Sequence, residues 1–336
     1  MRSRLMEIIR RRVAGTRAAL SPDPRPSTEV SGSWVGGRGS GGRKHILLPR
    51  VPRPLSLPLV FFLLLGLALG APAQQPAAPP ARLRVTCTTT LLSAVVSAVG
   101  GDSVDAHTIV PFGMCPGHFD LTPGEADKLR NADVLLYHGF EQFLKGAEPG
   151  SKTEVVKAGV KGNWMIPTVH TQAVERVRAV LTEAMPTAGA LFAERAEGYS
   201  RAVTQQAETS MKPLAAVRGT PVVCATMNRD LAEWLGCRVI AEFARDEDVS
   251  VKALHGILTE GKKSGAALVI DNMQSSGKIG RTIADELGIP FVMLSNFPES
   301  DSTDLGGYPY LETLKANIEA IAERLEGRGS RVEGKK

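Results

Sequence analysis

The chain has 336 residues, with 40 Lys and Arg against 35 Asp and Glu, and a formal net charge of +5. Residues 1–73 hold 12 of the basic and 3 of the acidic side chains, so residues 74–336 carry 28 basic and 32 acidic ones, a net charge of −4. This later part lacks the basic surface that nucleic-acid binding requires, and we expect no nucleic-acid partner. Its length suffices for one large or two medium α/β lobes.

The first 81 residues differ in composition from the rest of the chain. Residues 1–50 are rich in Arg, Gly, Ser and Pro without an apolar period, and we expect them to be disordered or to come from an over-extended start site. Residues 51–73 combine a basic start, a short apolar run and small residues at a cleavage site, which is the order of a signal peptide. A retained membrane anchor is the alternative. The sequence predicts a secreted protein, periplasmic or at the cell surface, with a linker at 74–81.

From residue 82 the chain alternates short β-branched runs with amphipathic segments. This alternation is typical of right-handed βαβ units and a mainly parallel sheet, and it predicts an N-terminal α/β lobe over 82–185. In chain order, we expect strands at 83–87, 104–110 and 134–137, and helices at 91–99, 123–131 and 139–144.

The middle of the chain is mostly helix-forming and is interrupted by Pro186. We expect a connecting helix within 186–217, formed by residues 188–214 and about 40 Å long at 1.5 Å per residue. The alternation then resumes and predicts a C-terminal α/β lobe over 218–326. In that lobe we expect strands at 221–225, 239–243, 267–270 and 291–294, and helices at 229–235, 251–262, 278–287 and 310–325.

The predicted fold is therefore α/β, with two Rossmann-like lobes joined by a long helix and a ligand cleft between them. Loops at the carboxyl ends of parallel strands are where such folds bind ligands. Metal-ligating side chains occur at five of these positions. They are Cys115 and His118 after the second strand, His138 after the third, and Cys224 and Asp271 at strand ends of the second lobe.

Thiolate, imidazole and carboxylate ligands together suit a tetrahedral zinc site, whereas a Cys/His/Met set that includes Met227 would suit copper. Other interpretations of the same residues stay open. In an oxidising compartment, Cys87 and Cys115 could form a disulfide, which would remove both thiols as ligands. His170 opens a predicted helix and is expected at the surface, and Cys237 is expected to be a small buried apolar residue.

Several segments resemble one family. The loop from Pro111 to Pro123, the segment from Leu129 to Gly139, the segment from Gly162 to Pro167, and Tyr310 followed by Asn317 occur in the order and spacing found in the zinc and manganese solute-binding proteins of ABC transporters. The resemblance covers about residues 83–325. It implies a monomeric receptor, not an enzyme, that binds a metal ion between its lobes and hands it to a membrane permease.

The ligand positions depart from that family. By ungapped comparison, Gly117, Gly162 and Ala225 stand where the family has His, and Asn272 falls near its carboxylate. The leading interpretation is a receptor for a transition-metal ion, zinc first, with copper or manganese as alternatives. Because the glycines open space, the same fold with a metal chelate or small organic ligand is the second interpretation.

Two further classes stay open. One is an enzyme with Cys115 or Cys224 as nucleophile and His118 or His138 as base, although no nucleophile elbow, Walker loop or Gly-x-Gly-x-x-Gly motif occurs. The other is a surface adhesin, for which the sequence offers no distinguishing feature beyond secretion.

Overall fold

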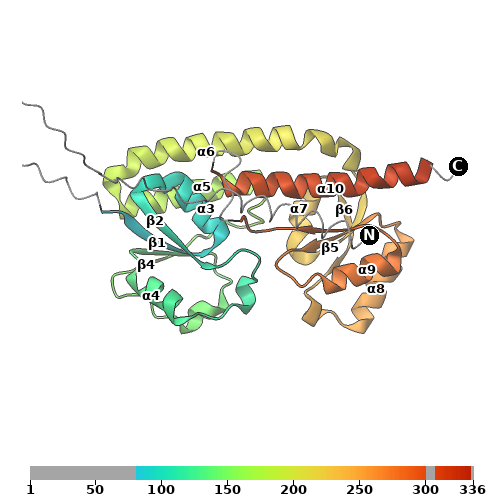
Figure 1. Cartoon of the computed structure of the whole chain (residues 1–336), viewed down its shortest axis with the longest axis horizontal. Coiled ribbons are helices and arrows are strands. Elements are labelled where there is room, and N and C mark those ends of the chain that lie inside the picture. Colours follow the sequence, from blue (N-terminus) through green and yellow to red (C-terminus); the bar gives the residue numbers. More distant parts are fainter. Residues whose placement is uncertain (1–80, 300–306, 334–336) are drawn as a thin grey trace, which may run out of the picture. The chain divides into compact units, whose positions relative to one another are not determined.

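Two four-stranded parallel sheets follow one another along the chain (Figure 1). The computed structural model describes residues 81–299 and 307–333, all within one compact unit, Pro76–Lys336. The regions predicted at 1–50 and 51–73, and all but the last residue of the predicted linker, lie outside the described residues. No helix within the described part combines the length and apolar character needed to cross a membrane.

The first sheet has the strand order β2-β1-β3-β4. Alternate residues of one strand enter different cores: Val134 and Leu136 pack under helices α3 and α5, and Leu135 packs under α4. Both faces are covered, which explains why the central strand β3 is a continuous apolar run. The elements are β1 (Leu83–Thr89), α3 (Thr90–Gly100), β2 (Val104–Val110), α4 (Pro123–Asn131), β3 (Val134–Tyr137), β4 (Glu154–Lys157) and α5 (Pro167–Ala184).

The second sheet repeats this plan with the order β6-β5-β7-β8. Val222 and Cys224 face helices α7 and α10, and Val223 faces α8 and α9. The elements are β5 (Pro221–Ala225), α7 (Arg229–Trp234), β6 (Arg238–Phe243), α8 (Val251–Lys263), β7 (Leu268–Asn272), α9 (Lys278–Leu287), β8 (Phe291–Leu294) and α10 (Pro309–Glu333).

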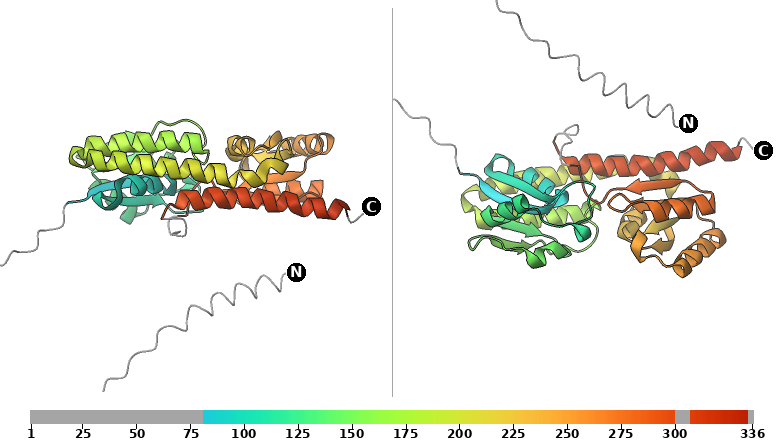
Figure 2. Two further views of the ribbon diagram at one scale, coloured as in Figure 1. Left: turned by 90° about the horizontal axis from the view of Figure 1, so that it is seen from above. Right: turned by 60° about the horizontal axis from the view of Figure 1, so that its bottom comes forward.

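Helix α6 (Gly189–Ser210) leads from the first sheet to the second, followed by the 3-10 segment Lys212–Val217. It packs on α3, α5 and α10, so one helical layer runs along both lobes (Figure 2). Its buried side chains, Phe192, Ala196, Tyr199, Val203 and Ala207, recur every three or four residues and form one apolar face. The helix predicted at 188–214 is therefore present but ends four residues earlier, at Ser210.

Two local predictions were wrong. Strand β4 was missed because it is a short edge strand with only Val156 buried, so its sequence carries little apolar signal. Residues 139–144 do not form an α-helix, and a 3-10 segment, Gln142–Gly146, stands there instead. The predicted α/β architecture of two lobes joined by a long helix is confirmed.

Candidate ligand cleft

A cavity of about 670 Å³ lies between the two lobes. Nearly all of its lining residues lie at or just after the carboxyl end of a strand, where parallel sheets present loops to ligands. The first lobe contributes residues after β2, β3 and β4, and the second lobe contributes residues at or after the ends of β5, β6, β7 and β8. The cleft predicted from the alternation of strands and helices is thus present.

Three of the five predicted ligands line this cavity: Cys115, His118 and His138. Cys115 precedes the short 3-10 turn Pro116–His118 on the loop after β2, and its thiol is free and partly exposed. His118 is exposed and reaches the second lobe. Its Nε2 lies 3.0 Å from Nη1 of Arg245 and 3.5 Å from Oε1 of Glu247.

The His138 ring is held on several sides. Its Nε2 lies 2.9 Å from Oγ1 of Thr89, it stacks on Phe140, and it meets Trp164 edge-on at 4.7 Å. Burial among these groups lowers the pKa of His138 to about 4, although the Glu141 carboxylate acts in the opposite direction. The imidazole is therefore neutral at physiological pH, which is the form that binds metals.

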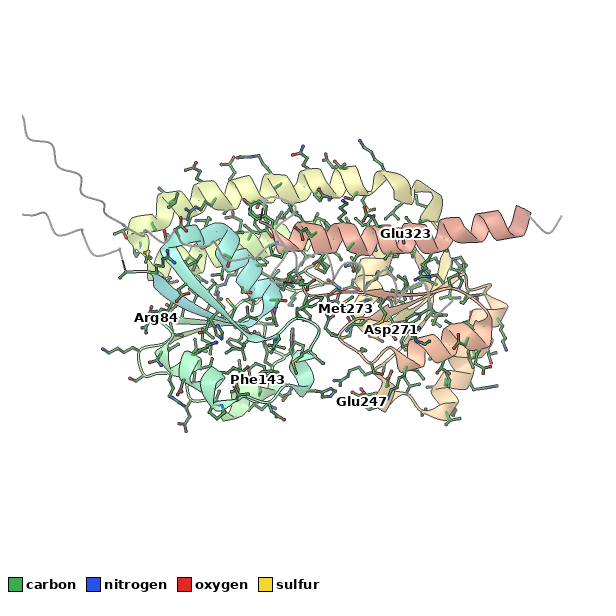
Figure 3. The ribbon with its side chains drawn as sticks, viewed as in Figure 1. Arg84, Phe143, Glu247, Asp271, Met273 and Glu323 are labelled. Carbon is green, nitrogen blue, oxygen red and sulfur yellow. The ribbon has the colours of Figure 1, made fainter. Side chains whose placement is uncertain are left out.

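Cys224 and Asp271 do not line the cavity. Cys224 is fully buried in the core, its Sγ contacts the carbonyl oxygen of Ala225, and burial raises the pKa of its thiol well above the ordinary value. Asp271 is also buried, with Oδ1 accepting the N–H of Asn272, and burial raises the pKa of its carboxyl group. Figure 3 shows Asp271 inside the second lobe.

The expectation that both residues face the cleft is therefore corrected. Side chains within a strand alternate between the two faces of the sheet, and helices cover both faces here. Only residues at the very end of a strand or beyond it reach the cleft, as Asn272 does directly after Asp271. Cys87 is buried in the first lobe for the same reason, and neither Cys87 nor Cys115 is in a disulfide.

Among the described residues, no three or more His, Cys, Asp or Glu side chains stand close enough together to hold a metal ion. The first lobe brings Cys115, His118 and His138 to one cavity without joining them into such a group. The five-residue ligand set is not assembled in this conformation.

Two of the glycines expected at ligand positions line the cavity. A Cβ built on Gly117 would lie 3.5 Å from Nη1 of Arg245 and 3.7 Å from Sγ of Cys115, which are ordinary contact distances. Gly162 has φ +98°, a backbone conformation that residues with a side chain rarely adopt. Ala225 is buried and does not line the cavity, whereas Asn272 does.

Sequence reasoning singled out Asn272 but missed the amide side chains that surround it in the cleft. Asn163 of the first lobe donates to Oδ1 of Asn296 at 2.8 Å and to the carbonyl oxygen of Met227 at 3.3 Å. Asn296 in turn donates to Oδ1 of Asn228 and, at 3.3 Å, to Oδ1 of Asn272. These bonds join the lobes directly. Each of these amides lies at the end of a strand or in the loop that follows one. That position in the sequence is the signal by which they could have been predicted to line the cleft.

Sequence reasoning also missed Arg245, which follows strand β6 and lines the cavity. Its Nε lies 3.5 Å from Oε1 of Glu247, and its Nη2 lies 3.3 Å from Oδ2 of Asp248. Figure 3 shows Glu247 on the side of the second lobe that faces the first. Because Arg245 is 127 positions from His118, only folding brings the two side chains together.

Two sheets of the same strand order, a connecting helix and a cleft at the strand ends define a two-lobed solute-binding protein. A family model described as zinc-uptake complex component A, periplasmic, matches residues 85–324. The chain belongs to this family of metal-binding substrate-binding proteins of ABC transporters, and the resemblance inferred from the sequence is confirmed.

Individual relatives match over short stretches. The iron ABC transporter substrate-binding lipoprotein MtsA of Streptococcus pyogenes is 36% identical over 58 residues, 17% of this chain and 19% of MtsA. The manganese ABC transporter substrate-binding lipoprotein PsaA of Streptococcus pneumoniae is 30% identical over 80 residues, 22% of this chain and 26% of PsaA. The matched stretch thus spans about a fifth to a quarter of these relatives' length.

A solved structure is similar over most of the fold. The laminin-binding protein of Streptococcus agalactiae, described as an adhesin with metal-transporting activity, superposes with a TM-score of 0.62. The two share 21% sequence identity, and the match covers 72% of this chain and 99% of that one. At this identity the similarity supports the fold alone.

Proposed function

We propose that this chain is the receptor of an ABC importer, which captures cargo in the cleft between its lobes and delivers it to a membrane permease. Family membership and the position of the cavity at the carboxyl ends of both sheets support this proposal. Such a receptor carries out no chemical step; it acts by closing its lobes on the ligand. We further propose that it is secreted to the periplasm or cell surface by a cleaved signal peptide and works as a monomer.

We propose that the cargo is a transition metal that arrives bound to a small organic chelator. The observation that carries this choice is the cavity itself. Its volume of about 670 Å³ is within the range of small-molecule sites, and amides and Arg245 line it where a bare cation would need a compact set of anionic ligands. The chelator supplies most of the metal's ligands in this arrangement.

Bare zinc is the second candidate cargo. Cys115, His118 and His138 line the same cavity, and a thiolate with two neutral imidazoles is a common zinc ligand set. This candidate requires the Cys115–His118 loop to move toward His138. With Met227, which also lines the cavity, a thioether is available for copper(I), and manganese is the least suited to sulfur ligands.

Elemental and native mass spectrometry of the full-length protein, purified without chelator under reducing conditions, tests the proposal. We expect one equivalent of metal and an added mass larger than that of the metal alone. An added mass equal to one zinc ion, lost in a Cys115→Ser, His118→Ala double variant, would select the second candidate. Protein that carries no metal and binds neither zinc, copper(I) and manganese nor their citrate complexes would contradict the metal-receptor function.

A further inference from the structure

We infer that Arg245 forms a carboxylate-binding subsite in the cleft, so the cargo is an anionic chelate that carries free carboxylate oxygens. This inference rests on the receptor function proposed above and specifies the chemical class of its ligand. It concerns a residue outside the predicted ligand set.

Among the described residues, the three nitrogens of the Arg245 guanidinium group have only exposed partners. Of its five N–H groups, the described structure commits one nitrogen, Nη1, to a hydrogen bond, with Nε2 of His118 at 3.0 Å. The ion pairs to Glu247 and Asp248 are 3.5 and 3.3 Å long, and both carboxylates are about half exposed. Exposed pairs of this kind contribute little free energy, so a ligand carboxylate can displace Glu247 and Asp248 from Nε and Nη2 and bind the planar fork in a bidentate fashion.

The cavity lining offers a bare cation few anionic ligands. Glu247 and Asp248 do not line the cavity; they contact the guanidinium from their own turn and orient it. Among the described lining residues, Asp230 is the one carboxylate and Arg245 the one side chain with a fixed positive charge. A divalent ion in this space would find Asp230 as the one carboxylate among the described lining residues, because Glu247 and Asp248 lie outside the lining and are paired with Arg245.

The neutral part of the wall suits the oxygen atoms of an organic ligand. Asn272, Gln274, Asn296 and Gln142 line the cavity with amide groups, and Ser275 adds a hydroxyl. Oδ1 of Asn272 accepts from Asn296, whereas its Nδ2 has no hydrogen-bond partner within the described residues and is available to a ligand. Gln274 and Asn296 already bond within the protein, so Asn272 and Gln142 are the amides open to carboxylate or hydroxyl oxygens of a ligand.

Gly117 links the subsite to the loss of a metal ligand. It stands where the related receptors have their first His, and the nearest atom to a Cβ built there is Nη1 of Arg245, at 3.5 Å. Glycine leaves room beside the guanidinium for a ligand group. Position 117 therefore lacks the His that would bind a cation, and the anion-binding Arg245 lies beside it.

Calorimetric titration of the full-length protein with zinc chloride, sodium citrate, zinc–citrate and zinc–nitrilotriacetate tests the inference. We expect a zinc carboxylate complex to bind at least about tenfold more tightly than zinc chloride. Arg245→Gln should weaken binding of that complex roughly 10- to 100-fold, because it removes charge-assisted hydrogen bonds. Arg245→Lys keeps the charge but loses the planar fork, so its affinity for the complex should lie between those of the unmodified protein and Arg245→Gln.

Arg238→Gln is the matched control, because Arg238 is an exposed arginine at the start of β6, the strand that Arg245 follows, and does not line the cavity. It should bind as the unmodified protein does, and circular dichroism should show all variants folded. Asp230→Asn should bind the anionic complex as well or better.

The remaining outcomes separate the two proposals. Equal binding of the complex by Arg245→Gln would overturn the Arg245 subsite and leave the receptor function standing. Binding of zinc chloride but of neither carboxylate complex would overturn the inference and favour bare zinc as the cargo. Binding of none of the four probes would count against both.

Discussion

At the residue scale, Gly117 and Gly162, the two cavity glycines expected at ligand positions, are not equivalent. Gly117 has a backbone conformation open to any residue, and a Cβ there makes only ordinary contacts. Gly162 has φ +98°, and a Cβ there lies 3.4 Å from the Val169 side chain. Restoring a His is therefore compatible with the fold at position 117, whereas at position 162 it strains the backbone.

Gly117→His should create a zinc ligand beside Cys115 and His118. In an Arg245→Gln background, which removes the repelling charge, we expect zinc affinity to rise by roughly tenfold or more, since a third donor joins the same loop. Calorimetric titration with zinc chloride measures this affinity. If the Gly117→His variant binds zinc no more tightly than its Arg245→Gln parent, the loop does not chelate zinc.

Gly162→His should instead lower the free energy of unfolding by about 1 to 3 kcal/mol through backbone strain, which denaturant unfolding measures.

At the scale of elements, one buried carboxylate decides the structure after strand β3. Glu141 accepts the hydroxyl of Thr88 at 2.5 Å and the backbone N–H groups of His138 and Gly139 at 2.8 and 2.6 Å. Burial alone would raise the pKa of Glu141, but these three hydrogen bonds and His138 lower it overall. The carboxylate thus ties the turn to strand β1 and holds His138 at the cleft, where an α-helix had been expected.

Glu141→Gln should destabilise the protein by about 2 kcal/mol, because one amide oxygen cannot accept all three donors and its NH2 group faces an N–H. Urea unfolding measures the change. Glu148→Gln, which removes an exposed carboxylate from the same loop region, is the control and should change stability by less than about 0.5 kcal/mol. Equal stability of the two variants would show that the Glu141 contacts contribute no net free energy.

At the scale of the whole molecule, His170 joins the helices that connect the lobes. It was expected at the surface, but it is fully buried on α5. Its Nε2 lies 2.9 Å from the hydroxyl of Tyr199 on α6, and its ring stacks on Tyr310 of α10 at 3.5 Å. Burial lowers the pKa of His170 to about 3. Its sequence position at the start of a helix gave no indication of this, because the partners lie on two other helices.

This burial makes stability depend on pH. The pKa of His170 is lower in the folded chain than the ordinary 6.5, so the unfolded chain takes up the proton first as pH falls. We expect its contribution to the free energy of unfolding to be fully present above pH 6.5 and to fall by on the order of 3 kcal/mol by pH 4.5. The loss of unfolding free energy between pH 7 and 4.5 should be smaller in His170→Phe and unchanged in His255→Asn, which alters an exposed His on α8. Denaturant titrations at the two pH values measure this loss. An equal loss in the unmodified protein and both variants would contradict the role of His170.

The sequence by itself determined most elements and the class of the protein. Strands β2, β3, β5 and β8 and helices α4 and α9 were predicted with the bounds they have, because β-branched runs and terminal signals act locally. Thr122 and Glu125 form the capping box that begins α4, and Gly288 ends α9 in a left-handed conformation. The positions of Cys115, His118 and His138 in loops after strands also predicted that they line the cleft, as they do.

Only the tertiary structure decided what the cleft contains. Whether a side chain near a strand end points into a core or toward the ligand depends on which helix covers its face, so Cys224 and Asp271 are buried while Asn272 lines the cavity. Arg245 meets His118, and Asn163 meets Asn296, across more than a hundred residues of sequence. Local sequence patterns fix elements, whereas the chemistry of a site between two lobes arises from contacts that form only when both lobes have folded.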